Sequence, residues 1–144
     1  MIDVLLIFVV SCAVVGIVVV IHYEALYKLT RILPRVKTKH RQRILLGIFG
    51  ALIAHSIEVW VFAFAYYFMI RSKRWGVLVG EFNNSLLDCM YFSFTTYTTL
   101  GFGDIIPHGD IRYLTGVESL TGLVLITWTA SFLYLEMQRY WDDH

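Results

Sequence analysis

The chain has 144 residues, of which 58% are hydrophobic and 16% aromatic, and its mean hydropathy is +0.64. This composition is too apolar for an ordinary water-soluble domain and predicts a single membrane-embedded domain. Twelve Lys and Arg residues nearly balance eleven Asp and Glu residues. The net charge therefore gives no field that would attract nucleic acid or an acidic partner.

Three apolar stretches are long enough to cross a bilayer as helices that rise about 1.5 Å per residue. They cover residues 4–21, 44–70 and 113–135. Residues 85–97 form a fourth apolar stretch, which is too short to cross and fits a re-entrant segment. Ser85, with Asp88 three residues later, resembles a capping box and is expected to start a short helix there.

Basic residues predict the orientation of the chain, because cytoplasmic loops collect Lys and Arg. The segment after the first span, which we call the basic loop, holds seven of the twelve: Lys28, Arg31, Arg35, Lys37, Lys39, Arg41 and Arg43. We expect this loop and the C-terminus in the cytoplasm and the N-terminus outside, in the plasma (inner) membrane. Anionic lipid headgroups are the expected partners of the loop, and Pro34 should end or kink the first helix.

The stretch TTYTTLGFGD, Thr95 to Asp104, interrupts the apolar pattern with four threonines and two glycines. Irregular backbone at membrane depth is tolerated only inside protein or beside a water-filled path, because an unsatisfied carbonyl group in lipid is costly. Gly101 and Gly103 can adopt positive φ without a Cβ penalty. The ribbon can therefore turn successive carbonyl groups to one side, where they can replace the water shell of an ion.

The residues Thr98 to Asp104, T-T-L-G-F-G-D, resemble the T-T-V-G-Y-G-D signature of the potassium channel pore-module family. The resemblance extends over about 85–135, with Tyr91 and Phe92 where the family places aromatic residues and Gly122 near its inner-helix hinge. The first span and the basic loop are similar to a three-span bacterial branch of this family.

This resemblance implies an all-α membrane protein with three transmembrane helices, a re-entrant pore helix and an extended selectivity filter, in the tetrameric potassium-channel pore fold. Residues 1–43 would form the N-terminal transmembrane helix and the basic loop, and residues 44–144 the pore module. Within the pore module, the outer helix, pore helix, filter and inner helix are expected at 44–70, 85–97, 98–104 and 111–138.

The resemblance also implies passive, K⁺-selective conduction through a homotetramer, since one chain supplies only one of the ribbons that must surround an axis. The ion-binding residues would be Thr99, Leu100, Gly101, Phe102 and Gly103, with K⁺ ions held at the first four. No organic cofactor is expected. The residues implied to support the filter are Tyr91, Phe92, Thr95, Thr98 and Asp104.

Two positions depart from the family pattern. Phe102 replaces the commoner tyrosine, so the hydroxyl that ties the filter to aromatic residues of the pore helix is absent. Thr95 stands where some members carry a glutamate that pairs with the aspartate after the filter, so this pair cannot form with Asp104. The rigidity of the filter and its slow inactivation are therefore expected to differ.

The last span is expected to be the inner helix, with a hinge at Gly122. Glycines such as Gly116 and Gly122 serve either as hinges or as points of close packing, which is their common use in membrane helices. The cavity face expected from helical spacing consists of Leu123, Ile126, Ala130 and Tyr134.

Five ionisable residues lie in or beside the spans, where such groups usually face protein or water: His22, Glu24, His55, Glu58 and Glu118. An antiparallel hairpin of the first two spans would bring His22 level with His55, which shares a helix face with Glu58. We expect a hydrogen-bonded network here. Proton sensing by the histidines and a metal or haem site are the alternatives. Glu118 is expected behind the pore helix, away from the ion path.

The sequence leaves three alternative functions open. A weakly selective cation channel, a haem- or metal-binding helical protein that uses His22 and His55, and an accessory channel subunit are the alternatives. No enzyme is expected, because neither a Ser–His–Asp pattern nor a Gly-x-Ser-x-Gly motif is present. No span carries arginine at every third position, which argues against a dedicated voltage sensor. Cys12 and Cys89 lie in apolar stretches and are expected to be free thiols.

Overall fold

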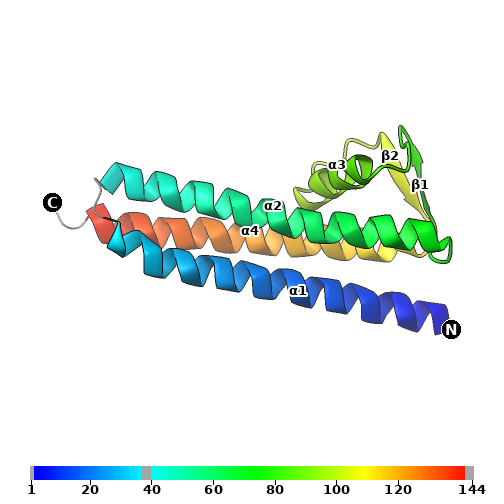
Figure 1. Cartoon of the computed structure of the whole chain (residues 1–144), viewed down its shortest axis with the longest axis horizontal. Helices are drawn as coiled ribbons and strands as arrows, with labels where there is room; N and C mark the ends of the chain where they lie inside the picture. Colours follow the sequence, from blue (N-terminus) through cyan, green and yellow to red (C-terminus); the bar gives the residue numbers. More distant parts are fainter. Residues whose placement is uncertain (1, 37–39, 142–144) are drawn as a thin grey trace.

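The computed structural model describes residues 2–36 and 40–141, in which three long helices run side by side (Figure 1). The elements in chain order are α1 (Ile2–Ile32) with a 3₁₀ turn η1 (Leu33–Arg35), α2 (His40–Ser72), β1 (Val77–Gly80), α3 (Leu86–Tyr97), β2 (Ile105–His108) and α4 (Ile111–Trp141). The short helix α3 and the two strands lie toward the end of the bundle that carries the N-terminus (Figure 1). The start of α2 and the end of α4 lie at the opposite end.

Among the described residues, three helices are long and apolar enough to span a membrane, which confirms the three expected spans. All three extend beyond the apolar stretches read from the sequence. The first continues to Ile32 because Leu26 and Leu33 prolong its buried stripe. Its α-helical part ends at the turn that contains Pro34, where proline cannot continue the hydrogen-bond ladder.

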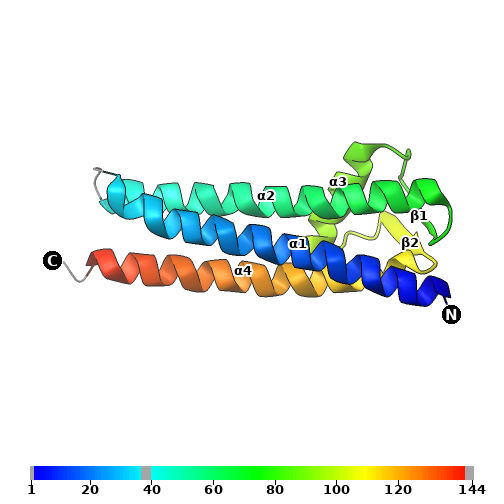
Figure 2. The same cartoon turned by 60° about the horizontal axis from the view of Figure 1, so that its bottom comes forward.

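Helix α1 packs along both α2 and α4 through one narrow face (Figure 2). Its buried residues recur at spacings of four or seven, at Ile7, Ser11, Val18, His22 and Leu26. This spacing keeps one side of a helix against its neighbours. The rest of α1 exposes aliphatic side chains such as Val9 and Val20, which suits contact with lipid.

The short helix α3 begins where the capping box predicted it. The backbone N–H of Asp88 donates to the Ser85 hydroxyl oxygen at 3.0 Å, and Ser85 has the extended backbone of an N-cap. The Asp88 carboxylate in turn accepts a hydrogen bond from the backbone N–H of Asn83 at 2.8 Å. These contacts fix the entry of the chain into α3.

A two-stranded antiparallel sheet that the sequence did not predict joins the segments before α3 and after the filter. Val77 pairs with His108, and Gly80 pairs with Ile105. A Cβ atom on Gly80, which has φ of 111°, would lie 2.0 Å from the Asp104 carbonyl oxygen, so only glycine fits. The otherwise helical fold thus holds the exit of the filter against the loop that leads into α3.

Candidate functional site

The backbone of residues 98–104 alternates in handedness. Thr99, Gly101 and Gly103 have φ of 59°, 51° and 81°. Reversing the sign of φ at every second residue flips every second peptide plane, so carbonyl groups that would alternate sides along a strand can point to one side. A Cβ atom would meet nothing within 4 Å at Gly101 or Gly103, so it is the conformation, not the available space, that favours glycine there.

Thr99 adopts the left-handed conformation although it is β-branched. Such a backbone costs of order 1–3 kcal/mol and persists only where the surroundings impose it. Its N–H donates to the Thr96 carbonyl oxygen at 3.0 Å, and the Gly101 N–H donates to the Thr95 carbonyl oxygen at 2.9 Å. These bonds to the end of α3 hold the ribbon in place.

The end of the filter is tied to α3 through Tyr91. The Tyr91 hydroxyl donates to an Asp104 carboxylate oxygen at 2.6 Å, and its ring stacks on Phe102 with centroids 6.5 Å apart. Phe92, the adjacent aromatic residue, is buried instead against Tyr66. The two aromatic positions expected to support the filter therefore contact different parts of the molecule.

The remaining support residues, Thr95 in α3 and Thr98 at its C-cap, bond backbone carbonyl oxygens of α3. The Thr95 hydroxyl donates to the Phe92 carbonyl oxygen, and the Thr98 hydroxyl donates to the Phe94 carbonyl oxygen. Neither side chain bonds Asp104. Since Thr95 cannot replace the missing glutamate, the contact made by Tyr91 anchors Asp104 in its place.

Glu118 lies behind α3, in a buried contact between three helices. Its two carboxylate oxygens accept hydrogen bonds from the Ser93 hydroxyl at 2.5 Å and from the Tyr66 hydroxyl at 2.6 Å. The neighbouring Ser119 hydroxyl donates to the Thr96 carbonyl oxygen at 3.2 Å. These contacts fasten α3 to α2 and α4, because buried polar groups must find partners.

Gly122 is a point of close packing in a helix that runs unbroken past it. A Cβ atom there would lie 2.0 Å from the Tyr97 carbonyl oxygen, a backbone atom. In contrast, nothing lies within 4 Å of a Cβ atom on Gly116. Of the two uses that the sequence left open for Gly122, the hinge is not seen, and the packing contact is.

The four residues expected on one cavity face of α4, Leu123, Ile126, Ala130 and Tyr134, are all exposed in the single chain. Ile126 and Ala130 also line a groove of about 410 Å³ between α2, α3 and α4. The exposed hydroxyls of Thr127 and Ser131 lie between Leu123 and Tyr134, and sequence reasoning missed them. Thr127 and Ser131 could have been found from their place on α4, because they lie on the side of the helix away from Glu118, Leu125 and Thr129, which are buried.

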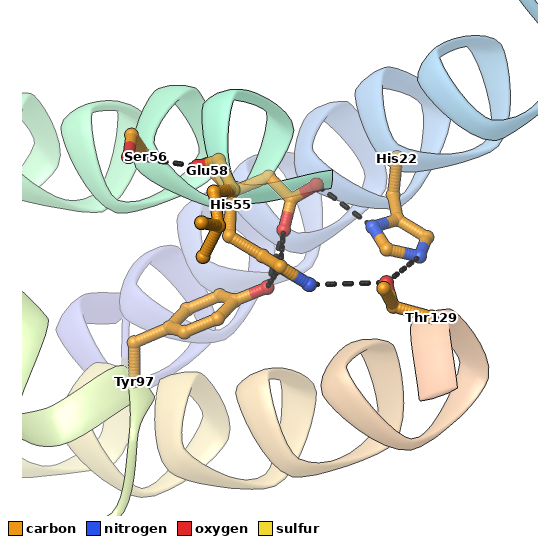
Figure 3. A network of polar contacts seen from close by, with 7 residues as sticks. His22, His55, Ser56, Glu58, Tyr97 and Thr129 are labelled. Carbon is orange, nitrogen blue, oxygen red and sulfur yellow. Dashed lines mark hydrogen bonds and ion pairs between the residues drawn. The ribbon is translucent and has the colours of Figure 1, made fainter. Parts of the chain in front are cut away.

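Five residues from all four α-helices form a buried polar group that we call the histidine cluster: His22, His55, Glu58, Tyr97 and Thr129 (Figure 3). His22 Nδ1 lies 2.8 Å from one Glu58 carboxylate oxygen, and His55 Nδ1 lies 3.0 Å from the other. The Tyr97 hydroxyl donates to Glu58 and lies 3.0 Å from His55 Nδ1. The Thr129 hydroxyl oxygen lies 3.0 Å from His55 Nε2 and 3.4 Å from His22 Nε2.

The hairpin of α1 and α2 brings His22 and His55 together as expected from their spacing, with ring centroids 5.3 Å apart. The expectation that Glu24 belongs to this network is wrong, because Glu24 is exposed. Two residues rotate a helix by about 200°, so Glu24 faces away from the side that His22 buries. Tyr97 and Thr129 were missed because neither is charged, although Thr129 lies three helical turns from Glu118 on the same face.

The segment from the end of α1 to the start of α2, which holds the basic loop, lies at the end of the bundle opposite the filter (Figure 1). Three other basic residues lie at the filter end, where α2 finishes: Arg71, Lys73 and Arg74. Lys37 and Lys39 fall outside the described residues. Arg43 donates through Nε to the Val36 carbonyl oxygen at 3.0 Å. The filter and the basic loop therefore lie toward opposite ends of the three helices.

A family model described as an ion channel matches residues 54–138, more than half of the chain. The matched region contains α3, the filter, Glu118 and most of α2 and α4, but it leaves out α1 and therefore His22. No curated protein and no solved structure matches the chain significantly.

Proposed function

The chain belongs to the ion channel family, among pore modules of the potassium-channel type, and we propose that four copies of it form a homotetramer that conducts K⁺ passively across the membrane. The observation that carries this proposal is the alternating backbone at Thr99, Gly101 and Gly103. The backbone N–H groups of Thr99 and Gly101 donate to carbonyl oxygens of α3, which leaves the carbonyl groups of the ribbon available to an ion. Conduction makes and breaks no covalent bond, so no catalytic residue is proposed.

The proposed assembly follows from what a single chain lacks. One ribbon offers carbonyl oxygens on one side only, whereas a dehydrated cation needs oxygens around it. Leu100 and Phe102 are 59% and 65% exposed in the single chain, although such side chains favour burial. Contact with neighbouring copies around a fourfold axis would cover them.

In the proposed mechanism, K⁺ leaves its water shell and passes between rings of carbonyl oxygens from Thr99, Leu100, Gly101 and Phe102, with the Thr99 hydroxyl below them and Gly103 closing the ribbon. The C-terminal end of α3 carries a partial negative charge and would favour a cation in the cavity. The exposed face of α4, with Thr127 and Ser131, would line that cavity. Several weak sites in series allow an ion both to bind and to leave.

We propose that the filter and the N-terminus face the outside of the plasma (inner) membrane and that the basic loop and the C-terminus face the cytoplasm. The seven Lys and Arg residues of the basic loop outnumber the three at the filter end, Arg71, Lys73 and Arg74, and this supports the orientation. Anionic headgroups would contact the loop there.

A flux assay with the purified chain in liposomes tests the function directly. We expect K⁺ to flow down its gradient, the reversal potential to shift when Na⁺ replaces K⁺ on one side, and the assembly to have the mass of four 16.7 kDa chains. Equal flux of both ions would instead support the weakly selective cation channel. A fourfold assembly that passes neither ion would support the accessory subunit.

The haem alternative finds less support in the geometry. Each imidazole of His22 and His55 already has both nitrogens within hydrogen-bond distance of Glu58, Tyr97 or Thr129. A macrocycle would have to enter between two rings whose centroids are 5.3 Å apart. Absorbance of a bis-histidine haem in the purified protein would reverse this judgement.

A further inference from the structure

With both imidazoles neutral, the histidine cluster has one hydrogen fewer than its close polar contacts need. An added proton or metal cation, each of which brings positive charge, could correct this. A neutral imidazole carries one N–H, and the Glu58 carboxylate only accepts. Because each Nδ1 faces a Glu58 oxygen, His22 and His55 both place their proton on Nδ1. Both Nε2 atoms are then acceptors that face the Thr129 hydroxyl, which has a single proton to give. One of the two contacts with Thr129 therefore lacks a hydrogen.

The Tyr97 hydroxyl does not supply the missing hydrogen, because it donates to Glu58. A cation placed on the Nδ1 side would resolve the shortage. It would displace both Nδ1 protons and leave each imidazole with an N–H at Nε2. The Thr129 oxygen has two lone pairs and can accept from both.

We propose that His22, His55 and Glu58 bind a divalent transition-metal cation, with Zn²⁺ as the best fit. Ligand atoms of the three residues lie within 4.8 Å of one another. In a tetrahedral zinc site with bonds of about 2.0 Å, neighbouring ligand atoms lie about 3.3 Å apart. His22 Nδ1 lies 2.8 Å from one Glu58 oxygen and His55 Nδ1 lies 3.0 Å from the other. These separations would open by a few tenths of an ångström, and Glu58 would bind through both oxygens or turn to offer one.

The ligand set selects the class of metal. Two imidazoles and one carboxylate suit Zn²⁺, and also Co²⁺ or Ni²⁺, whereas Mg²⁺ and Ca²⁺ prefer oxygen ligands alone. The Tyr97 hydroxyl oxygen or a water molecule would take the fourth position, since Tyr97 already contacts both Glu58 and His55. Thr129 orients both histidines from behind, as outer partners of metal-bound imidazoles do.

The position of the cluster gives a bound metal a route and a role. His22 and Glu58 are fully buried, but His55 lines the groove between α2, α3 and α4 and can admit an ion from there. The metal would join α1 to α2 beside Tyr97, the last residue of α3, directly before the filter. It would therefore tie the helix outside the matched pore module to the support of the filter.

Zn²⁺ binding to the purified, chelator-stripped full chain tests the proposal by titration calorimetry and metal analysis, without any measurement of flux. We expect one Zn²⁺ per chain, and binding weaker by about a hundredfold or more in His22→Gln and His55→Gln. His108→Gln is the matched control, because His108 is exposed on β2, away from the cluster, and it should bind as the unmodified chain does.

Unchanged binding in His22→Gln and His55→Gln would overturn the proposal. So would a lack of Zn²⁺ binding by the unmodified chain, because the missing charge would then be a proton. If the glutamine variants fail to fold, X-ray absorption of the Co²⁺-loaded unmodified chain decides: two imidazole nitrogens on the metal support the site, and any other shell overturns it. A chain that binds Zn²⁺ but passes no K⁺ would contradict only the proposed conduction.

Discussion

Tyr91 on α3 donates a hydrogen bond to Asp104 at the end of the filter, with 2.6 Å between the hydroxyl and carboxylate oxygens. The ring of the same residue stacks on Phe102. The two contacts of Tyr91 hold Phe102 and Asp104 where other anchoring groups are absent: Phe102 has no hydroxyl, and Thr95 has no carboxyl that could pair with Asp104. The carboxylate raises the pKa of Tyr91, chiefly through this hydrogen bond, so the hydroxyl stays a donor to higher pH than a free tyrosine.

Tyr91→Phe should shorten the time for which the channel conducts, because it removes the hydrogen bond to Asp104 and keeps the stacked ring. We expect K⁺ flux that starts near the normal rate and then decays about severalfold faster, as stacking alone holds the filter less firmly. The time course of flux in liposomes measures this. Tyr23→Phe, on the exposed side of α1, is the control. Identical decay in all three proteins would show that Asp104 needs no such anchor.

Gly101→Ala should abolish most K⁺ flux while leaving the protein folded. A Cβ atom has free space at Gly101, but φ of 51° is unfavourable for alanine by about 1–2 kcal/mol. Each of the four proposed copies would carry this strain at residue 101, so the four ribbons should leave the conducting conformation. Gly116→Ala is a matched control, because its site is equally open and lies in a regular helix. Flux retained in Gly101→Ala would contradict the proposed role of the alternating backbone.

The long helices and the start of α3 could be predicted because each rests on a local signal. Apolar length sets the three spans, and Ser85 with Asp88 marks the start of the short helix. The sheet was missed because each strand has only four residues, and β2 contains Pro107, which removes a hydrogen-bond donor. Its pairing depends on segments that the fold brings together from both sides of α3.

The filter was predicted more completely than the histidine cluster, again because local signals can be read from sequence and long-range contacts cannot. The filter depends on consecutive residues, so its sequence was readable. The histidine cluster draws on four helices, and the hairpin argument could pair His22 with His55 but could not reach Tyr97 or Thr129. The wrong placement of Glu24 came from helix rotation, because the two-residue step from His22 to Glu24 turns the helix by about 200°.

The Asp88 carboxylate should stabilise the start of α3 in a pH-dependent manner. The hydrogen bond from the Asn83 backbone N–H lowers the pKa of Asp88 from its usual 3.8. A lowered pKa in the folded state gives stability that is present above the unfolded value and is lost as the pH falls through the folded value. Asp88→Asn should therefore lower the thermal midpoint at pH 7 and make little difference well below pH 3.8.

Thermal unfolding in detergent at both pH values measures this effect. Glu81→Gln, which also removes one exposed carboxylate near the same loop, serves as the control and should change neither midpoint appreciably. An Asp88→Asn midpoint that is lowered equally at both pH values would mean that the charge of Asp88 is not what fixes the cap.

Gly122→Ala should separate the inner helix from the end of α3. The added Cβ atom would lie 2.0 Å from the Tyr97 carbonyl oxygen, and neither backbone can move aside without disturbing the filter that follows Tyr97. We expect a destabilisation of about 1–3 kcal/mol together with reduced K⁺ flux, measured by thermal unfolding and in liposomes. Gly116→Ala lies less than two turns away on α4 with nothing near its Cβ, so it should be neutral or slightly stabilising. If Gly122→Ala instead kept full stability but conducted abnormally, the residue would act as a hinge, because a hinge depends on flexibility and a packing point depends on space.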